Sequence, residues 1–97
     1  MNDLPARLAL LAAQGKTTTY GALAADLGCR VADLTAALER LMEEDAAAGR
    51  PLRAAVVNAR HSDLPARGFF LKAAALGLVI DVPEAFVTAE RKALLQP

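Results

Sequence analysis

Very few residues of this 97-residue chain could carry out nucleophilic or metal chemistry. Cys29 is the single cysteine and His61 the single histidine, and they lie far apart in the sequence. A reactive thiolate needs a base or a cation beside it, and only Arg30 is adjacent to Cys29. One cysteine excludes an internal disulfide and a cysteine-based zinc site. We therefore expect Cys29 to be a small structural residue and expect no metal site.

Other catalytic signatures are missing from the sequence. It contains no Gly-rich phosphate loop, no Gly-x-Ser-x-Gly turn and no paired-histidine motif. The acidic run 43–45 is predicted to be an exposed helix end rather than a general acid/base pair. A catalytic site must join a nucleophile or metal, a base and an orienting group. The sequence therefore predicts a protein that is not an enzyme and uses no cofactor.

Charge is segregated along the chain although the net charge is zero. Residues 26–45 hold six acidic residues against two arginines, and residues 50–72 hold five basic residues against Asp63, with His61 in addition. An exposed basic stretch could bind a polyanion, or the acidic and basic stretches of two copies could bind each other. A solvated surface without a partner remains an equally open interpretation.

The elements that must position these residues are mainly helical. Hydrophobic residues make up 55% of the chain and aromatic residues only 4%, which favours helices packed through small side chains. Apolar residues recur at spacings of three and four, which predicts helices over 4–14, 20–27, 31–46 and 83–95. The third helix is expected to fray after Met42. The predicted buried residues are Leu23, Leu27, Val31, Leu34, Leu38, Leu41, Val56 and Phe69.

The pattern changes after Pro51. Val56 and Val57 lie in a run without helical spacing, which predicts a strand over 52–58. Residues 60–68 are polar, contain Pro and Gly, and are predicted to form a loop. The segment that begins at Phe69 is either a returning strand or the start of a helix through Leu78.

Residues 23–41 resemble the helix-turn-helix of bacterial DNA-binding proteins. Ala24 is small where two helices would cross, and Gly28 suits a turn residue with positive φ. Together with a helix before it and a strand and loop after it, this arrangement resembles a winged helix; an alanine-rich bundle is the alternative. The predicted fold is thus a single α+β domain over 1–97, mostly helical, of the winged helix-turn-helix type with a small β-wing and a C-terminal helix.

Two further resemblances concern shorter segments. GRPLRAAVVN at 49–58 and LPARGFF at 64–70 resemble a strand and loop, GRPLL-A-VVN and G-PG-GFF, of uncharacterised bacterial winged-helix proteins. Asp63 and Ala66 replace two glycines of that pattern, so we expect a stiffer loop. GKTTTYGALA at 15–24 resembles the segment leading into the helix-turn-helix of alkylguanine-DNA alkyltransferases, in which the tyrosine matching Tyr20 helps to rotate the damaged nucleotide. The Pro-Cys-His-Arg reaction centre of that family is missing.

The predicted reading helix is poorly suited to sequence recognition. Bases are usually read by Arg, Lys, Asn or Gln, whereas this outward face carries Asp33 and Glu39, which repel phosphates. We therefore predict weak binding of duplex DNA through the wing and flanking arginines. The alternative is a winged helix that binds another protein or a second copy and no DNA. The predicted contact residues are Arg30, Thr35, Arg40, Arg53, Arg60, His61, Arg67 and Lys72.

The sequence also bears on location. The first residues lack the basic and then apolar pattern of a signal peptide. The longest nearly uncharged stretch, 73–80, is far shorter than the ~20 residues that span a bilayer. We therefore expect a cytoplasmic protein without a membrane partner.

Overall fold

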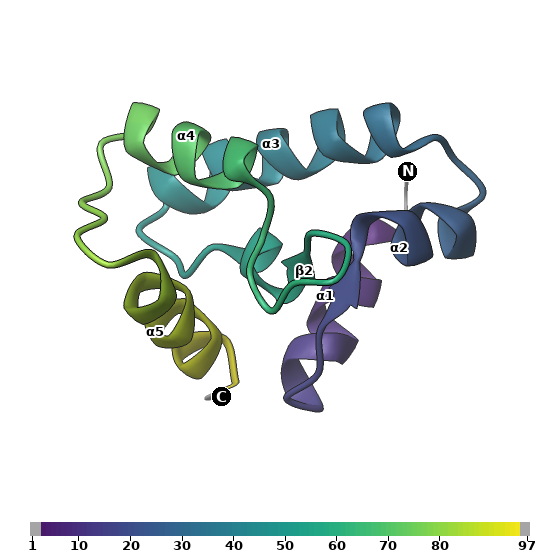
Figure 1. Ribbon diagram of the computed structural model, residues 1–97, viewed down its shortest axis with the longest axis horizontal. Helices are drawn as coiled ribbons and strands as arrows, with labels where there is room; N and C mark the ends of the chain where they lie inside the picture. The colour runs from purple at the N-terminus through teal and green to yellow at the C-terminus, as the bar shows by residue number, and fades with distance from the viewer. Residues whose placement is uncertain (1–2, 96–97) are drawn as a thin grey trace.

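The computed structural model describes residues 3–95, which form an α+β fold that is mostly helical, as predicted (Figure 1). Four of its five α-helices coincide, within a residue or two at their ends, with those expected from apolar spacing. The elements in chain order are α1 (Leu4–Ala13), β1 (Thr18–Thr19), α2 (Tyr20–Leu27), α3 (Val31–Ala47), the 3-10 helix η1 (Arg53–Val56), β2 (Val57–Asn58), α4 (Arg67–Ala75) and α5 (Pro83–Leu95).

Helices α2 and α3 are consecutive and joined by a short turn. The Thr19 hydroxyl accepts a hydrogen bond from the N–H of Ala22 and so caps α2. Gly28 ends α2 in the left-handed conformation, with φ of 68°, which glycine adopts without steric cost. Helix α3 continues to Ala47, so the expected fraying after Met42 was wrong. The helix continues because its last turns lie against the core.

The strand expected over 52–58 is reduced to β2, and η1 takes up the rest. Strand β2 pairs in parallel with β1, with Thr18 opposite Val57 and Thr19 opposite Asn58. Since β1 has only two residues, the ladder cannot extend further, and the preceding residues 54–56 are buried as a 3-10 turn instead.

The segment that begins at Phe69 adopts the helical alternative and belongs to α4. Its sequence ends in Leu-Lys-Ala-Ala-Ala, which has a high helix propensity. Within residues 3–95 there is consequently no returning strand and no antiparallel hairpin, so the expected small β-wing is not formed. The loop 59–66 connects β2 directly to α4.

The core is centred on η1, against which α1, α3 and α5 all pack (Figure 1). Leu27, predicted to be buried, is only partly so and packs against the edge of the core. Val31, also predicted to be buried, is the first residue of α3 and is 47% exposed, whereas Leu34 one turn later is fully buried. The remaining predicted core residues are all buried: Leu23, Leu34, Leu38, Leu41, Val56 and Phe69.

Asp45, on the last turns of α3, is fully buried and fixes the start of η1. Its carboxylate accepts a hydrogen bond from the backbone N–H of Arg53 at 3.0 Å. The Arg53 guanidinium approaches the same carboxylate to 2.9 Å, and that of Arg50 approaches it to 3.2 Å. Burying a carboxylate is costly unless it is paired and hydrogen-bonded, and Asp45 meets both conditions.

Helix α5 ties down the same segment with two further side chains. The Glu90 carboxylate accepts a hydrogen bond from the N–H of Leu52 at 3.1 Å. The Arg91 guanidinium donates to the carbonyl oxygen of Ala55 at 2.8 Å and to the side-chain oxygen of Asn58. Burial lowers the pKa of Arg91, and the charge of Asp63 opposes that shift. The polar groups around η1 thus have a structural role.

Candidate nucleic-acid interface and the adjoining pocket

Three of the predicted contact residues are cations engaged in ion pairs. Arg53 is held against the buried Asp45, which directs its charge toward the core. The Lys72 ammonium on α4 pairs with the Glu43 carboxylate on α3. At the start of α3, the Arg30 guanidinium lies 3.2 Å from the Asp33 carboxylate. Part of the basic stretch is therefore neutralised within the molecule.

Three other predicted contact residues, Arg40, Arg60 and Arg67, are exposed. Among residues 3–95, no carboxylate lies within 4.0 Å of their guanidinium groups. They come from α3, from loop 59–66 and from the first turn of α4, respectively. These arginines are the cations of the predicted set that can reach an external anion.

The loop 59–66 holds His61, which has a positive φ of 58°, rare for a residue other than glycine. The Arg60 Nε–H donates to the His61 ring at 3.2 Å. His61 also borders an open polar hollow of about 390 Å³, together with Ser62, Asp63 and the three threonines 17–19. Hydroxyl groups and an imidazole can donate hydrogen bonds to phosphate, whereas Asp63 repels it.

The outward face of α3 is divided. Asp33 and Arg40 are exposed as predicted, and so are the two alanines at 32 and 36. Thr35 and Glu39 are half-buried and face a pocket between α3 and the start of α4. Between Ala32 and Arg40, the exposed part of this helix therefore presents small side chains, the Asp33 carboxylate paired with Arg30, and the Arg40 guanidinium.

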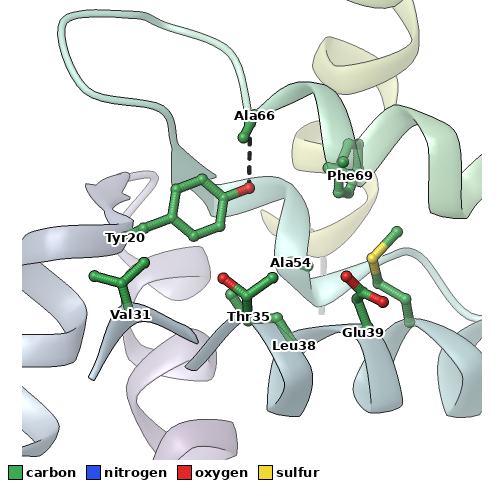
Figure 2. A pocket seen from close by; sticks show the side chains of 10 residues that line it. Tyr20, Val31, Thr35, Leu38, Glu39, Ala54, Ala66 and Phe69 are labelled. Carbon is green, nitrogen blue, oxygen red and sulfur yellow. Dashed lines mark hydrogen bonds between the residues drawn. The ribbon is translucent and has the colours of Figure 1, made fainter. Parts of the chain in front are cut away.

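The pocket between α3 and the start of α4 was not predicted from the sequence (Figure 2). Its volume is about 180 Å³, and most of its walls are apolar. Helix α3 contributes Leu38 and Met42, η1 contributes Ala54, and α4 contributes Phe69. The pocket exists because α4 is a helix that lies along α3, and that arrangement was one of two alternatives for the sequence.

Tyr20, the first residue of α2, closes one side of the pocket. Its hydroxyl oxygen accepts a hydrogen bond from the N–H of Ala66 at 3.2 Å and so links α2 to the start of α4 (Figure 2). Burial raises the pKa of Tyr20; the Ala66 N–H, which stabilises the tyrosinate, opposes this, and the negative charge of Glu39 adds to the rise. The position singled out by the alkyltransferase resemblance thus lies in the wall of a pocket.

The remaining candidates for chemistry are the thiol of Cys29 and clusters of metal-ligating side chains. Cys29 is a free thiol, half-buried in the turn between α2 and α3. Among residues 3–95, no group of three His, Cys, Asp or Glu side chains is arranged to hold a metal ion. None of the helices in that range is both long enough and apolar enough to cross a membrane. The exposed arginines and the pocket are the two candidate sites compared below.

Known proteins offer no guide to the choice between these sites. No protein-family model, no curated protein and no solved structure matches the chain. The two sites differ in chemistry: one presents cations to solvent, and the other presents a carboxylate beside apolar walls.

Proposed function

We propose that the protein is a non-enzymatic binding module of the winged-helix type that holds duplex DNA weakly. In this proposal α2 and α3 are the helix-turn-helix, and loop 59–66 takes the place of the wing. The observation that carries it is a set of three exposed arginines for which residues 3–95 supply no carboxylate within 4.0 Å: Arg40, Arg60 and Arg67. Guanidinium groups bind phosphates through paired N–H donors and do so for any base sequence.

Such binding would show little preference between DNA sequences. Of the exposed residues on the first turns of α3, two are alanines, and Asp33 is paired with Arg30. None of these offers the pair of hydrogen bonds with which proteins discriminate base edges. Affinity would then come from phosphate contacts, and about three such contacts predict a slope near −2.7 for log affinity against log salt.

The test is a titration of fluorescently labelled duplexes with the full chain at several salt concentrations from about 50 to 200 mM, the range over which phosphate contacts are strongly screened. The double variant Arg60→Ala/Arg67→Ala should bind every duplex more weakly and should flatten the salt slope by about 1.8, since each lost contact removes about 0.9.

The matched control is Lys16→Ala/Lys92→Ala, which removes two exposed positive charges outside the proposed interface. It should leave most of the affinity intact. Equal losses in the two double variants, or no binding by the unaltered protein at about 50 mM salt, would refute the proposal, because phosphate-driven affinity is greatest at low salt.

Association with another copy or another protein is the second candidate function. It is favoured by exposed apolar side chains on and after α4: Val79 is 78% exposed, and Leu71 and Val82 are more than half exposed. Apolar side chains that gather on a surface favour protein contacts. Light scattering at micromolar concentration distinguishes the candidates: a dimer that binds no duplex would establish association in place of DNA binding.

A further inference from the structure

The pocket between α3 and α4 has the size of one aromatic ring. Its volume is about 180 Å³, and apolar cavities of about 150 Å³ in other proteins bind benzene. Leu38, Met42, Ala54 and Phe69 provide walls without hydrogen-bonding groups in their side chains. Val31 is half-exposed at the rim, so the pocket opens to solvent there. A single ring can therefore enter and be largely desolvated.

Within residues 3–95, Glu39 is the only charged side chain that lines this pocket. It is half-buried, and among residues 3–95 it has no hydrogen bond and no ion pair within 4.0 Å. Arg40 follows it in the chain and Arg67 lies between two lining residues, yet neither pairs with it. By contrast, the buried Asp45 pairs with Arg53, and the half-buried Glu90 accepts a hydrogen bond from the N–H of Leu52.

We propose that this pocket binds a small organic cation consisting of one aromatic ring and an amidinium or ammonium group. The ring lies against Leu38, Met42 and Phe69, and the cation reaches the Glu39 carboxylate. Figure 2 shows the Glu39 carboxylate beneath Phe69, and the Thr35 hydroxyl farther along α3 on the side of Tyr20. An amidinium can donate two parallel N–H groups to a carboxylate, which is the strong geometry for such a pair. None of the three arginines of the proposed DNA interface lines this pocket.

The charge of Glu39 selects the class of ligand. An anion would be repelled at close range in a partly buried site, where the effective dielectric constant is low. A neutral arene would fill the apolar part but would leave the carboxylate with less water and no partner, which costs free energy. A cation of the same shape both fills the pocket and pairs the carboxylate.

The experiment compares benzamidine, which is charged at neutral pH, with benzamide, its neutral counterpart of nearly the same shape. Binding to the full chain is followed by NMR through the Met42 methyl group and the ring of Tyr20, the only tyrosine. For a ligand of this size we expect a Kd of about 1 mM for benzamidine. Benzamide should bind about tenfold more weakly or worse, as expected when a charged hydrogen bond is lost.

Two matched Glu→Gln variants on α3 test which carboxylate pairs with the bound cation. Glu39→Gln should weaken benzamidine binding about tenfold and should reduce the preference over benzamide, since a charged partner is removed from a partly buried site. Glu44→Gln removes an exposed carboxylate that does not line the pocket and should leave the affinity unchanged. Arg67→Ala should leave the affinity unchanged or raise it.

The proposal is overturned if the Met42 and Tyr20 signals do not respond to benzamidine at about ten times the expected Kd. It is also overturned if benzamidine and benzamide bind the unaltered protein equally, a comparison that needs no variant to fold. Equal losses in Glu39→Gln and Glu44→Gln would overturn the role of Glu39.

Discussion

Asp45 and Glu39 are carboxylates on the same helix, yet their surroundings differ completely. Asp45 is fully buried and receives the backbone N–H of Arg53 together with the guanidinium groups of two arginines. Glu39 is half-buried at the side of an apolar pocket and has no partner among residues 3–95. One side of α3 is thus closed by internal pairs, and the other is open to an incoming group.

The difference between the two carboxylates indicates that one stabilises the fold and the other is available to bind a ligand. A carboxylate whose hydrogen bonds are all supplied internally stabilises the fold and offers nothing to a ligand. A carboxylate that the fold leaves unpaired contributes little to stability and keeps its hydrogen-bonding capacity. We therefore expect substitutions at the closed side to affect unfolding, and substitutions at the open side to affect binding.

The largest effect is expected for Asp45→Asn. It leaves the Arg53 guanidinium, which is mostly buried, without its counter-charge, and breaking such a pair costs about 3–5 kcal/mol of unfolding free energy. Urea denaturation followed by circular dichroism measures the loss. Glu39→Gln should change the unfolding free energy by less than about 0.5 kcal/mol. Similar losses in both variants would end the distinction between the two sides.

Leucine truncation compares two positions of the buried stripe of α3, one away from the pocket and one beside it. Leu34 is fully buried away from the pocket, whereas Leu38 is buried but also forms part of the pocket wall. Both Leu→Ala changes should cost ~2–5 kcal/mol, with Leu34 near the upper end because its cavity has no existing space to join. Thermal melts of the two variants give the order. An unchanged melt for Leu38→Ala would show that the register of α3 is wrong.

Tyr20→Phe should have a smaller effect, about 1 kcal/mol, the usual net value of one hydrogen bond. The ring remains in the pocket wall, but the N–H of Ala66 loses its acceptor. Hydrogen exchange at the Ala66 amide should become faster, whereas exchange within the last turns of α3 should not change. If the Ala66 amide stays protected, the hydroxyl does not tie α4 to α2.

The smallest effect concerns proton binding by the same hydroxyl. Burial raises the pKa of Tyr20 above its ordinary value of 10.0, and Glu39 adds to the rise. Since the unfolded chain then loses this proton first, Tyr20 stabilises the folded state below pH 10, and this contribution is lost as the pH rises through the folded-state pKa. Absorbance at 295 nm follows the titration.

The variant Glu39→Gln should lower the pKa of Tyr20 but leave it above the ordinary value, because burial, the larger cause, remains. Glu44→Gln should not move it. A pKa that fails to respond to Glu39→Gln would place the carboxylate farther from Tyr20 than the structure does.

The sequence predicted four of the five α-helices of residues 3–95, because the spacing of apolar residues depends on helix geometry alone. The fifth, α4, was one of two alternatives for its segment. The limits of α2, predicted as 20–27, were correct for a similar reason, since capping by Thr19 and Gly28 is local. The strand predicted over 52–58 was too long. Val56 and Val57 are apolar and buried, and a run of buried apolar residues has the same sequence pattern in a strand and in a short 3-10 helix.

Asp45 and the pocket show where local patterns stop being informative. Asp45 was grouped with an acidic run expected at an exposed helix end, although it continues the stripe of Leu34, Leu38 and Leu41 at a spacing of four. That spacing was the available signal, but its partner Arg53 is brought near only by the turn after Gly49. The pocket needs α4 beside α3, a contact between segments distant in the sequence.

The central place of η1 has a consequence for how the chain loses its structure. Helices α1, α3 and α5 each pack against this one short segment, and α1 and α5 also pack against each other. A fragment that stops before Arg53 would therefore keep its helical propensities and the packing of α2 on α3, but it would lose the segment against which α1 and α3 both pack. We expect unfolding to be a single all-or-none transition, with coincident curves from the Tyr20 ring near α4 and from amide signals in α1.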